Sequence, residues 1–296
     1  MTDSDSPSQI QRLTLAAQTR RARNRGAASR QQIVYFENEI GNRLLERLTY
    51  IKHQPRTILN MGCGLARHSA QLAKNYPNAT IVQLDPALEI LKFPAGKSLS
   101  QKLRTLFKAR PSRICAEPRA LPLAPQSLDM VWANLLSVAT DAPVIIAELK
   151  RVLKPGGLLM LATVGPDTLK ELRAAFALVD PLPHVQPQID MHDLGDMLVH
   201  EGYTTPVVDM EMLTLTYPNL NTLAHDLRAA GATNLVDGRR ATLTGKDRWT
   251  RVERAYELMR SNGQLPASVE LIYLHAWRGL ERKTSDGRQI IHFDKR

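Results

Sequence analysis

The sequence has few cysteines and no long apolar run. Cys63 and Cys115 are the only cysteines in 296 residues, and no cysteine and histidine cluster has the spacing of a zinc site. No apolar stretch approaches the roughly 18 residues of a membrane span. The first eight residues are polar and rich in proline and serine, without the apolar core of a secretory signal. We therefore expect a cytoplasmic protein without disulfide, metal or membrane association.

Aromatic residues make up only 5% of the chain, and acidic residues are missing from two long stretches. No acid lies between Asp5 and Glu37 or between Glu89 and Glu117, although these stretches hold six and seven basic residues. Within a formal charge of +10, such segments can speed association with an acidic partner. They would also fit nucleic acid, but few aromatic residues are interleaved for base stacking, which makes nucleic acid an unlikely partner. A solvated basic surface explains them equally well.

Residues 55–85 predict one compact binding unit. Thr57–Met61 is a short apolar run typical of a buried parallel strand, and Gly62 and Gly64 permit a tight turn behind it. A crossover helix is expected from Ala66 to Asn75, followed by a second strand that ends at Asp85. A carboxylate placed about 20 residues after the turn can accept hydrogen bonds from both ribose hydroxyls.

The turn does not have the pattern of a phosphate-binding loop. A third glycine is missing after Gly62 and Gly64, and no Lys-Ser or Lys-Thr pair follows as in a P-loop. A ligand that contains a ribose but no pyrophosphate fits better, and S-adenosylmethionine (SAM) is such a ligand. Glycines behind a strand are also common as plain turns, so the motif alone leaves this open.

Downstream blocks carry a resemblance to a known family. Residues 151–157 read RVLKPGG, a turn that resembles that of the class I SAM-dependent methyltransferases. More specific blocks resemble the malonyl-acyl-carrier-protein O-methyltransferases of biotin synthesis over roughly residues 23–277. They include Thr163–Arg173, His184, Ile189–Asp196, Pro206–Glu211, Thr214–Tyr217 and His275–Trp277. Assembly proteins of mitochondrial complex I share these blocks.

The resemblance implies an α/β fold, a doubly wound seven-stranded Rossmann-like sheet with N-terminal helices and a helical insertion before the last strand. It divides the chain into residues 1–53 (tail and helices), 54–218 (SAM-binding core), 219–265 (insertion) and 266–296 (last strand and tail). It also implies SAM as cofactor and malonyl-acyl carrier protein, which is acidic, as partner. The expected cofactor-binding residues are Asn60, Gly62, Cys63, Gly64, Asp85, Pro86, Glu117 and Asn134.

The methyl acceptor of this reaction requires no base. A free malonyl carboxylate has a pKa near the roughly 4 of ordinary carboxylic acids, so it is already ionised at neutral pH. The protein must align it with the methyl group and fix its charge, which a cation can do. Arg173 is our first candidate for that cation, because it follows the fifth strand at the carboxyl edge of the sheet. Arg30 is the second.

Several positions depart from the family pattern. Asn60 and Glu117 each stand where an aspartate is usual, Leu65-Ala66 replaces Thr-Gly, and Arg30-Gln31 replaces a Tyr-Asp pair. These changes lie where the cofactor is expected. They leave a second interpretation open, namely a weak or inactive paralogue that binds a protein partner or acts in assembly. A nucleic-acid-binding relative is a third.

The remaining elements follow from apolar periodicity and turn residues. Helices are expected at Gln9–Thr19, Gln31–Lys52, Asp141–Leu153, Leu220–Ala230 and Asp247–Ser261. Strands are expected at Ser112–Ala116, Ser127–Ala133, Leu158–Thr163, Thr205–Thr216 and Val269–Trp277, with a short one possible at Gln289–Phe293.

Overall fold

The computed structural model describes residues 7–65, 67–92, 112–138, 141–240 and 242–280. Its strands are β1 (Thr57–Met61), β2 (Thr80–Asp85), β3 (Ser112–Cys115), β4 (Leu128–Ala133), β5 (Leu153–Val164), β6 (Tyr203–Tyr217) and β7 (Leu265–Arg278). Its helices are α1 (Pro7–Gly26), the 3₁₀ helix η1 (Ala27–Gln32), α2 (Val34–Leu48), α3 (Arg67–Asn75), α4 (Leu88–Lys92), α6 (Ala142–Val152), α7 (Lys170–Ala177), α8 (Met191–Glu201), α9 (Leu220–Ala230) and α10 (Lys246–Glu257). The strand proposed at residues 289–293 lies outside the described residues.

Within the described residues, the strands form one seven-stranded sheet in the order β3-β2-β1-β4-β5-β7-β6. The first five strands are parallel, and β7 runs antiparallel to both β5 and β6. The first strand, β1, lies in the middle of the sheet. The next two strands, β2 and β3, extend the sheet to one edge, and β4 then pairs with the other side of β1. This confirms the expected doubly wound, Rossmann-like fold, in which a ligand binds where the winding reverses, outside the carboxyl ends of β1 and β4.

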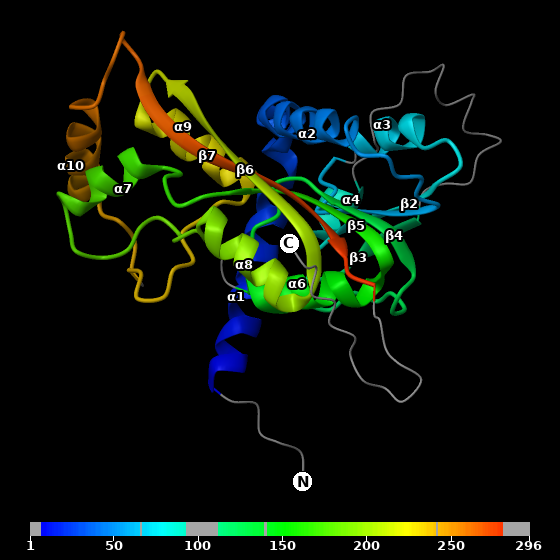
Figure 1. The fold of residues 1–296 in the computed structure, drawn as a ribbon. Coiled ribbons are helices and arrows are strands. Elements are labelled where there is room, and N and C mark those ends of the chain that lie inside the picture. Colours follow the sequence, from blue (N-terminus) through cyan, green and yellow to red (C-terminus); the bar gives the residue numbers. More distant parts are fainter. Residues whose placement is uncertain (1–6, 66, 93–111, 139–140, 241, 281–296) are drawn as a thin grey trace, which may run out of the picture.

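Helices cover both faces of the sheet (Figure 1). On one face, α2 and α3 pack on a cluster that contains the fully buried Trp132 and Tyr273. On the other face, α6 and α8 pack on a second cluster that contains Leu59 and Val131. The central strands are apolar on both faces because neither face meets water. The expected apolar stripe Ile40, Leu44, Leu45 and Leu48 of α2 is buried in the first cluster.

A third cluster lies beyond the sheet. The strands β6 and β7 are long, at 15 and 14 residues, and Figure 1 shows α7, α9 and α10 gathered near their far ends. Here the fully buried Tyr256 of α10 packs with Tyr217 and Leu265, and its hydroxyl donates to the carbonyl of Pro266 at 2.7 Å. The segment between β6 and β7 therefore packs, together with α7 and the ends of both strands, around a separate cluster.

The N-terminal helices differ from the prediction. The first continues to Gly26 instead of ending near Thr19, and the expected long helix from Gln31 is preceded by η1 and begins at Val34. The reason is tertiary: α1 and η1 pack against α9, far along the chain. A Cβ built on Gly26 would lie 2.6 Å from the carbonyl oxygen of Ala229, so only glycine permits this close contact.

The strand expected at Leu158–Thr163 begins earlier, at Leu153. Leu153 pairs with Leu128, and the register then shifts before Leu158 pairs with Met130. The Lys-Pro-Gly-Gly turn is thus an irregularity within a strand, with Gly156 at φ +74°, rather than a turn before one. Among the described residues, no helix combines the length and the apolar character needed to cross a membrane.

Candidate functional site

The glycine turn lies directly behind β1, at the carboxyl end of the parallel strands. Gly62 and Gly64 have φ values of +63° and +51°, in the left-handed region that glycine adopts readily. Between them, the amide of Cys63 donates to the carbonyl of Leu84 at 3.0 Å, which ties the turn to β2. The expected turn is therefore present, and it faces the end of the second strand.

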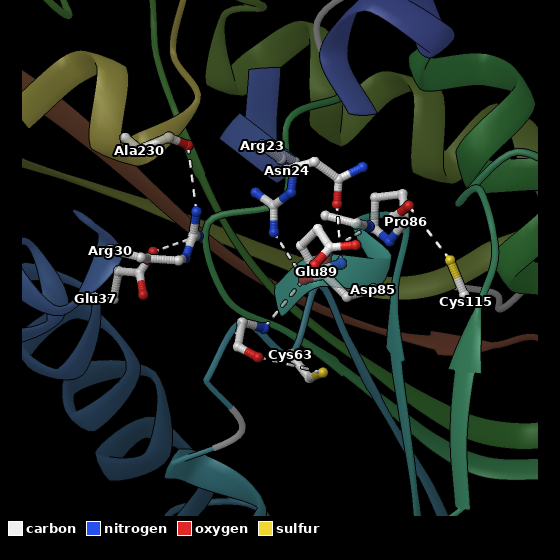
Figure 2. Close-up of polar contacts among 12 residues, drawn as sticks. Arg23, Asn24, Arg30, Glu37, Cys63, Asp85, Pro86, Glu89, Cys115 and Ala230 are labelled. Atoms are coloured by element: carbon white, nitrogen blue, oxygen red, sulfur yellow. Dashed lines mark hydrogen bonds and ion pairs between the residues drawn. The ribbon is translucent and has the colours of Figure 1, made fainter. Parts of the chain in front are cut away.

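Asp85 ends β2 beside this turn and is fully buried. Its Oδ2 accepts from the amide of Gly64 at 3.1 Å, and its Oδ1 accepts from the amide of Ala87 at 2.9 Å. The guanidinium of Arg23, on α1, also donates to Oδ2 at 2.7 Å (Figure 2). Burial alone would lower the pKa of Arg23, but the charge of Asp85 and this hydrogen bond raise it. The carboxylate is thus held in place by two backbone amides and one cation.

Arg30 and Glu37 form an ion pair on the other side of the turn. A Cβ built on Gly64 would lie 3.6 Å from Glu37 Oε2 and 3.7 Å from Arg30 Nε, so the pair directly borders the turn. Burial lowers the pKa of Arg30, and repulsion from Arg23 adds to the effect. Burial also raises the pKa of Glu37 despite its cationic neighbours. A second anion near Arg30 would relieve the first of these shifts.

Two asparagines approach the turn from β1 and from the end of β4. Asn60 donates from Nδ2 to the hydroxyl of Ser69 at 2.8 Å, and Asn134 donates from Nδ2 to the carbonyl of Glu37 at 2.8 Å. The Oδ1 atoms of both are buried and accept no hydrogen bond from any described residue, and the buried Nε of Arg30 has no acceptor there. Buried polar atoms are normally satisfied. These three atoms around one turn fit a polar ligand that brings both donors and an acceptor.

Glu117, Pro86 and the two cysteines lie along the β2 and β3 side. Glu117 follows β3 and pairs with Arg20 of α1 at 3.3 Å, and burial raises the pKa of Glu117. Cys115 donates weakly from its thiol to the carbonyl of Pro86, at 3.5 Å. Burial, with a smaller effect of Asp85, raises the pKa of Cys63 to about 12, so this thiol is a packing residue. No described residues form a group that could hold a metal ion.

Arg173 lies elsewhere. It is on α7, and its guanidinium donates to the carbonyls of Pro166 at 2.8 Å and Thr168 at 3.3 Å. With Phe176 and residues 180–188 it lines a separate surface pocket of about 420 Å³. Figure 1 shows α7 beside α10, on the opposite side of the view from α3. The structure thus groups the predicted cofactor-binding residues and Arg30 around the glycine turn, whereas Arg173 lies beyond the carboxyl end of β5, on carbonyls of the loop that follows this strand.

The sequence did not indicate Arg20, Arg23 or Glu37 as site residues. The arginines lie three apart on α1, a spacing that puts them on one helix face, but their partners are 97 and 62 residues away in sequence. Because Arg20, Arg23 and Arg30 are all paired with acids, the first acid-free stretch is not a uniformly free basic surface. Residues 93–111 of the second stretch lie outside the described part of the chain.

Known proteins share this sequence over nearly its whole length. Residues 59–161 match the family described as "Methyltransferase domain". The "Malonyl-[acyl-carrier protein] O-methyltransferase" of Laribacter hongkongensis is 44% identical over 275 residues, which cover 91% of this chain and 93% of that protein. The protein of the same name from Gallionella capsiferriformans is 46% identical over 274 residues, which cover 92% and 94%.

Solved structures agree with the fold. The YcgJ protein of Bacillus subtilis superposes with a TM-score of 0.52 over 80% of this chain and 97% of its own, at 14% identity. A chain from Bacillus halodurans gives a TM-score of 0.53 over 81% and 98%, at 13% identity. At such low identity these likenesses concern the fold alone.

Proposed function

The chain belongs to the family of malonyl-[acyl-carrier protein] O-methyltransferases, and from this premise we propose that it methylates the free carboxylate of a malonyl thioester on an acyl carrier protein. The methyl donor in this proposal is SAM. The product is a methyl ester, and the resemblance in the sequence blocks extends the proposal to biotin synthesis.

One observation carries the proposal. Gly62 and Gly64, the buried carboxylate of Asp85, and the unsatisfied Oδ1 atoms of Asn60 and Asn134 lie together at the carboxyl ends of β1, β2 and β4. A SAM molecule would offer ribose hydroxyls to Asp85 and an ammonium group to an amide oxygen, and the close backbone at the glycines would leave room for its chain. We infer that Glu117 and Pro86 border the adenine, and that Cys63 packs beneath the turn.

The chemistry places few demands on the protein. When bound, SAM supplies a methyl group activated by its sulfonium. The acceptor carboxylate is already ionised at neutral pH, so the described residues need only orient it, keep water away, and balance its charge. Orientation of this kind can contribute on the order of 7–11 kcal/mol to catalysis.

Arg30 is the better placed of the two candidate cations for the acceptor. Its side chain is buried beside Gly64, and its Nε has no acceptor among the described residues, although Nη2 pairs with Glu37 and Nη1 donates to the carbonyl of Ala230. A buried guanidinium N–H without an acceptor can donate a strong, charge-assisted hydrogen bond to a carboxylate. Arg173, which lies beyond the end of β5 and outside the group at the glycine turn, would instead be available to the carrier protein or its prosthetic arm.

Radioactive methyl transfer from SAM to malonyl-acyl carrier protein tests the proposal. Purified protein should convert the malonyl carrier, with a mass gain of one methyl group, and should leave the acetyl and unloaded carriers unchanged. Calorimetry with S-adenosylhomocysteine should show binding in the micromolar range. Absence of both binding and transfer would refute the proposal and favour the weak or inactive, protein-binding paralogue.

A matched pair of variants tests Arg30. We expect Arg30→Met to raise the KM for the malonyl carrier by roughly tenfold or more, the effect of losing one charge-assisted contact. Arg25→Met is the control, because Arg25 lies on the preceding helix α1 and is exposed. An unchanged KM for Arg30→Met, with turnover intact, would remove Arg30 from the acceptor site.

A further inference from the structure

Helix α1 places arginines on both acids assigned to the nucleoside. Arg23 Nη2 lies 2.7 Å from Asp85 Oδ2, and Arg20 Nη1 lies 3.3 Å from Glu117 Oε1. The two arginines are three residues apart and therefore share one face of the helix. In Figure 2 the guanidinium of Arg23 points down onto the end of β2, where the ribose is expected.

Asp85 cannot accept hydrogen bonds from Arg23 and from both ribose hydroxyls at the same time, because its hydrogen-bonding capacity is limited. A carboxylate offers about four lone-pair positions. The amides of Gly64 and Ala87 and the guanidinium of Arg23 take three of them, which leaves one for a ribose that has two hydroxyls. The backbone amides are fixed by the turn and by the start of α4, so Arg23 is the donor that must leave.

One hydrogen bond to Asp85 holds the guanidinium of Arg23. Its buried Nε finds no acceptor among the described residues. Its side chain is 17% exposed, whereas that of Asp85 is completely buried. A guanidinium that loses this one bond can turn toward water, but the carboxylate cannot.

The backbone of Arg23 packs against the C-terminal end of α9. A Cβ built on Gly231, which has φ +73°, would lie 2.9 Å from Arg23 Cγ and 3.0 Å from its Cα. Next to it, Arg30 donates to the carbonyl of Ala230, the last residue of α9, at 3.4 Å (Figure 2). Cations at a helix C-terminus are stabilised by the helix dipole. The base of the Arg23 side chain is therefore packed against the segment between β6 and β7, and its guanidinium reaches Asp85.

We propose that Arg23 is a positioning residue that closes the nucleoside site: it pairs with Asp85 before the cofactor binds, yields that carboxylate to the ribose, and thereby loosens α1 from the end of α9. Arg20, which pairs with the partly exposed Glu117, opposes cofactor binding in the same way but more weakly. The inference rests on the proposed function, because it takes SAM as the incoming ligand. It adds an order of events, in which cofactor entry precedes a rearrangement of α1 against the segment between β6 and β7.

The test compares Arg23→Gln with wild type in stopped-flow and calorimetric titrations with S-adenosylhomocysteine. Glutamine is shorter than arginine and neutral, so it does not hold Asp85 in the closed form, and the carboxylate keeps its two backbone amide donors. If the closed form is populated about 80% of the time, its removal tightens binding about fivefold. We expect that gain mainly in the association rate. Arg25→Gln, exposed on the same helix, should bind as wild type does.

Two further measurements can test the inference even if Arg23→Gln does not fold. Arg20→Gln changes a half-exposed side chain and should also bind the ligand more tightly, by a smaller factor. In the wild-type protein, hydrogen exchange at residues 20–31 and 228–231 should become faster when S-adenosylhomocysteine is added. Slower exchange there, or weaker binding by Arg23→Gln, would mean that α1 clamps the bound cofactor, and would overturn the inference.

The outcomes separate this inference from the proposed function. Equal affinities for wild type, Arg23→Gln and Arg20→Gln would refute the closing role of Arg23 and leave the methyltransferase proposal standing. If none of the three binds S-adenosylhomocysteine at millimolar concentration, the proposed function fails, and the closing role fails with it.

Discussion

Asp85→Asn is the most direct test of the cofactor site. The substitution keeps the shape of a fully buried side chain and removes its charge. Each hydrogen bond from a ribose hydroxyl to the carboxylate is expected to contribute about 1.5–3 kcal/mol, as bonds to charged groups do. The amide oxygen of asparagine recovers about 1 kcal/mol, and release of Arg23 offsets a further part. The net loss should be about 2–4 kcal/mol, or a roughly 30- to 1000-fold rise in Kd.

Calorimetry with S-adenosylhomocysteine measures this change. Because Asp85 also accepts from the amides of Gly64 and Ala87, a thermal melt must first establish that the variant is folded at the assay temperature. Glu89→Gln is the control: Glu89 lies nearby on α4, is half exposed, and pairs with Lys92. A folded Asp85→Asn protein whose Kd stays within about threefold of wild type would refute the assignment of Asp85 to the ribose.

Three other predictions concern stability and reactivity. Gly41→Ala should lower the free energy of unfolding by about 1–3 kcal/mol, measured by urea denaturation, because the new Cβ would lie 2.2 Å from the buried ring of His68; an unchanged midpoint contradicts this. Asp129→Ala should cost about 1–3 kcal/mol, because Asp129 accepts from two backbone amides and a lysine. Burial alone would raise the pKa of Asp129, but these donors lower it. The loss of stability in Asp129→Ala, measured from the melting curves of variant and wild type, should therefore be full above pH 3.8, the ordinary pKa, and shrink as the pH falls through the lowered pKa. A loss that grows on acidification would have the wrong sign. Limiting iodoacetamide at neutral pH should alkylate the exposed Cys115 before the half-buried Cys63, whose pKa is raised to about 12, and peptide mass mapping that finds Cys63 modified first would contradict this order.

Local sequence was sufficient where one element's own residues determine its structure. The first strand occupies Thr57–Met61 and α9 occupies Leu220–Ala230, as predicted. The strand is a short apolar run between polar turns, and α9 lies between an asparagine cap and a glycine at its C-terminal end. Such signals act over a few residues and can be identified without knowledge of the fold.

Boundaries moved where distant segments compete with the local pattern. The strand β5 extends back through Lys-Pro-Gly-Gly because Leu153 finds a partner in Leu128. The helix α10 ends at Glu257 rather than Ser261, where Ser261 instead pairs with Gln264 in an isolated bridge ahead of β7. Neither partner is visible in the turn residues themselves.

The candidate site divides in the same way. The glycine turn and Asp85 followed from the sequence, because a parallel α/β unit brings the ends of its strands to one edge wherever it occurs. The sequence also determined that one end of the chain would be rich in arginine. Only the tertiary structure decided what those arginines do, because the ion pairs of Arg20, Arg23 and Arg30 depend on how α1 and η1 lie across the sheet edge and α9. Contacts between segments that are 62 to 200 residues apart are determined by packing, and no local spacing encodes them.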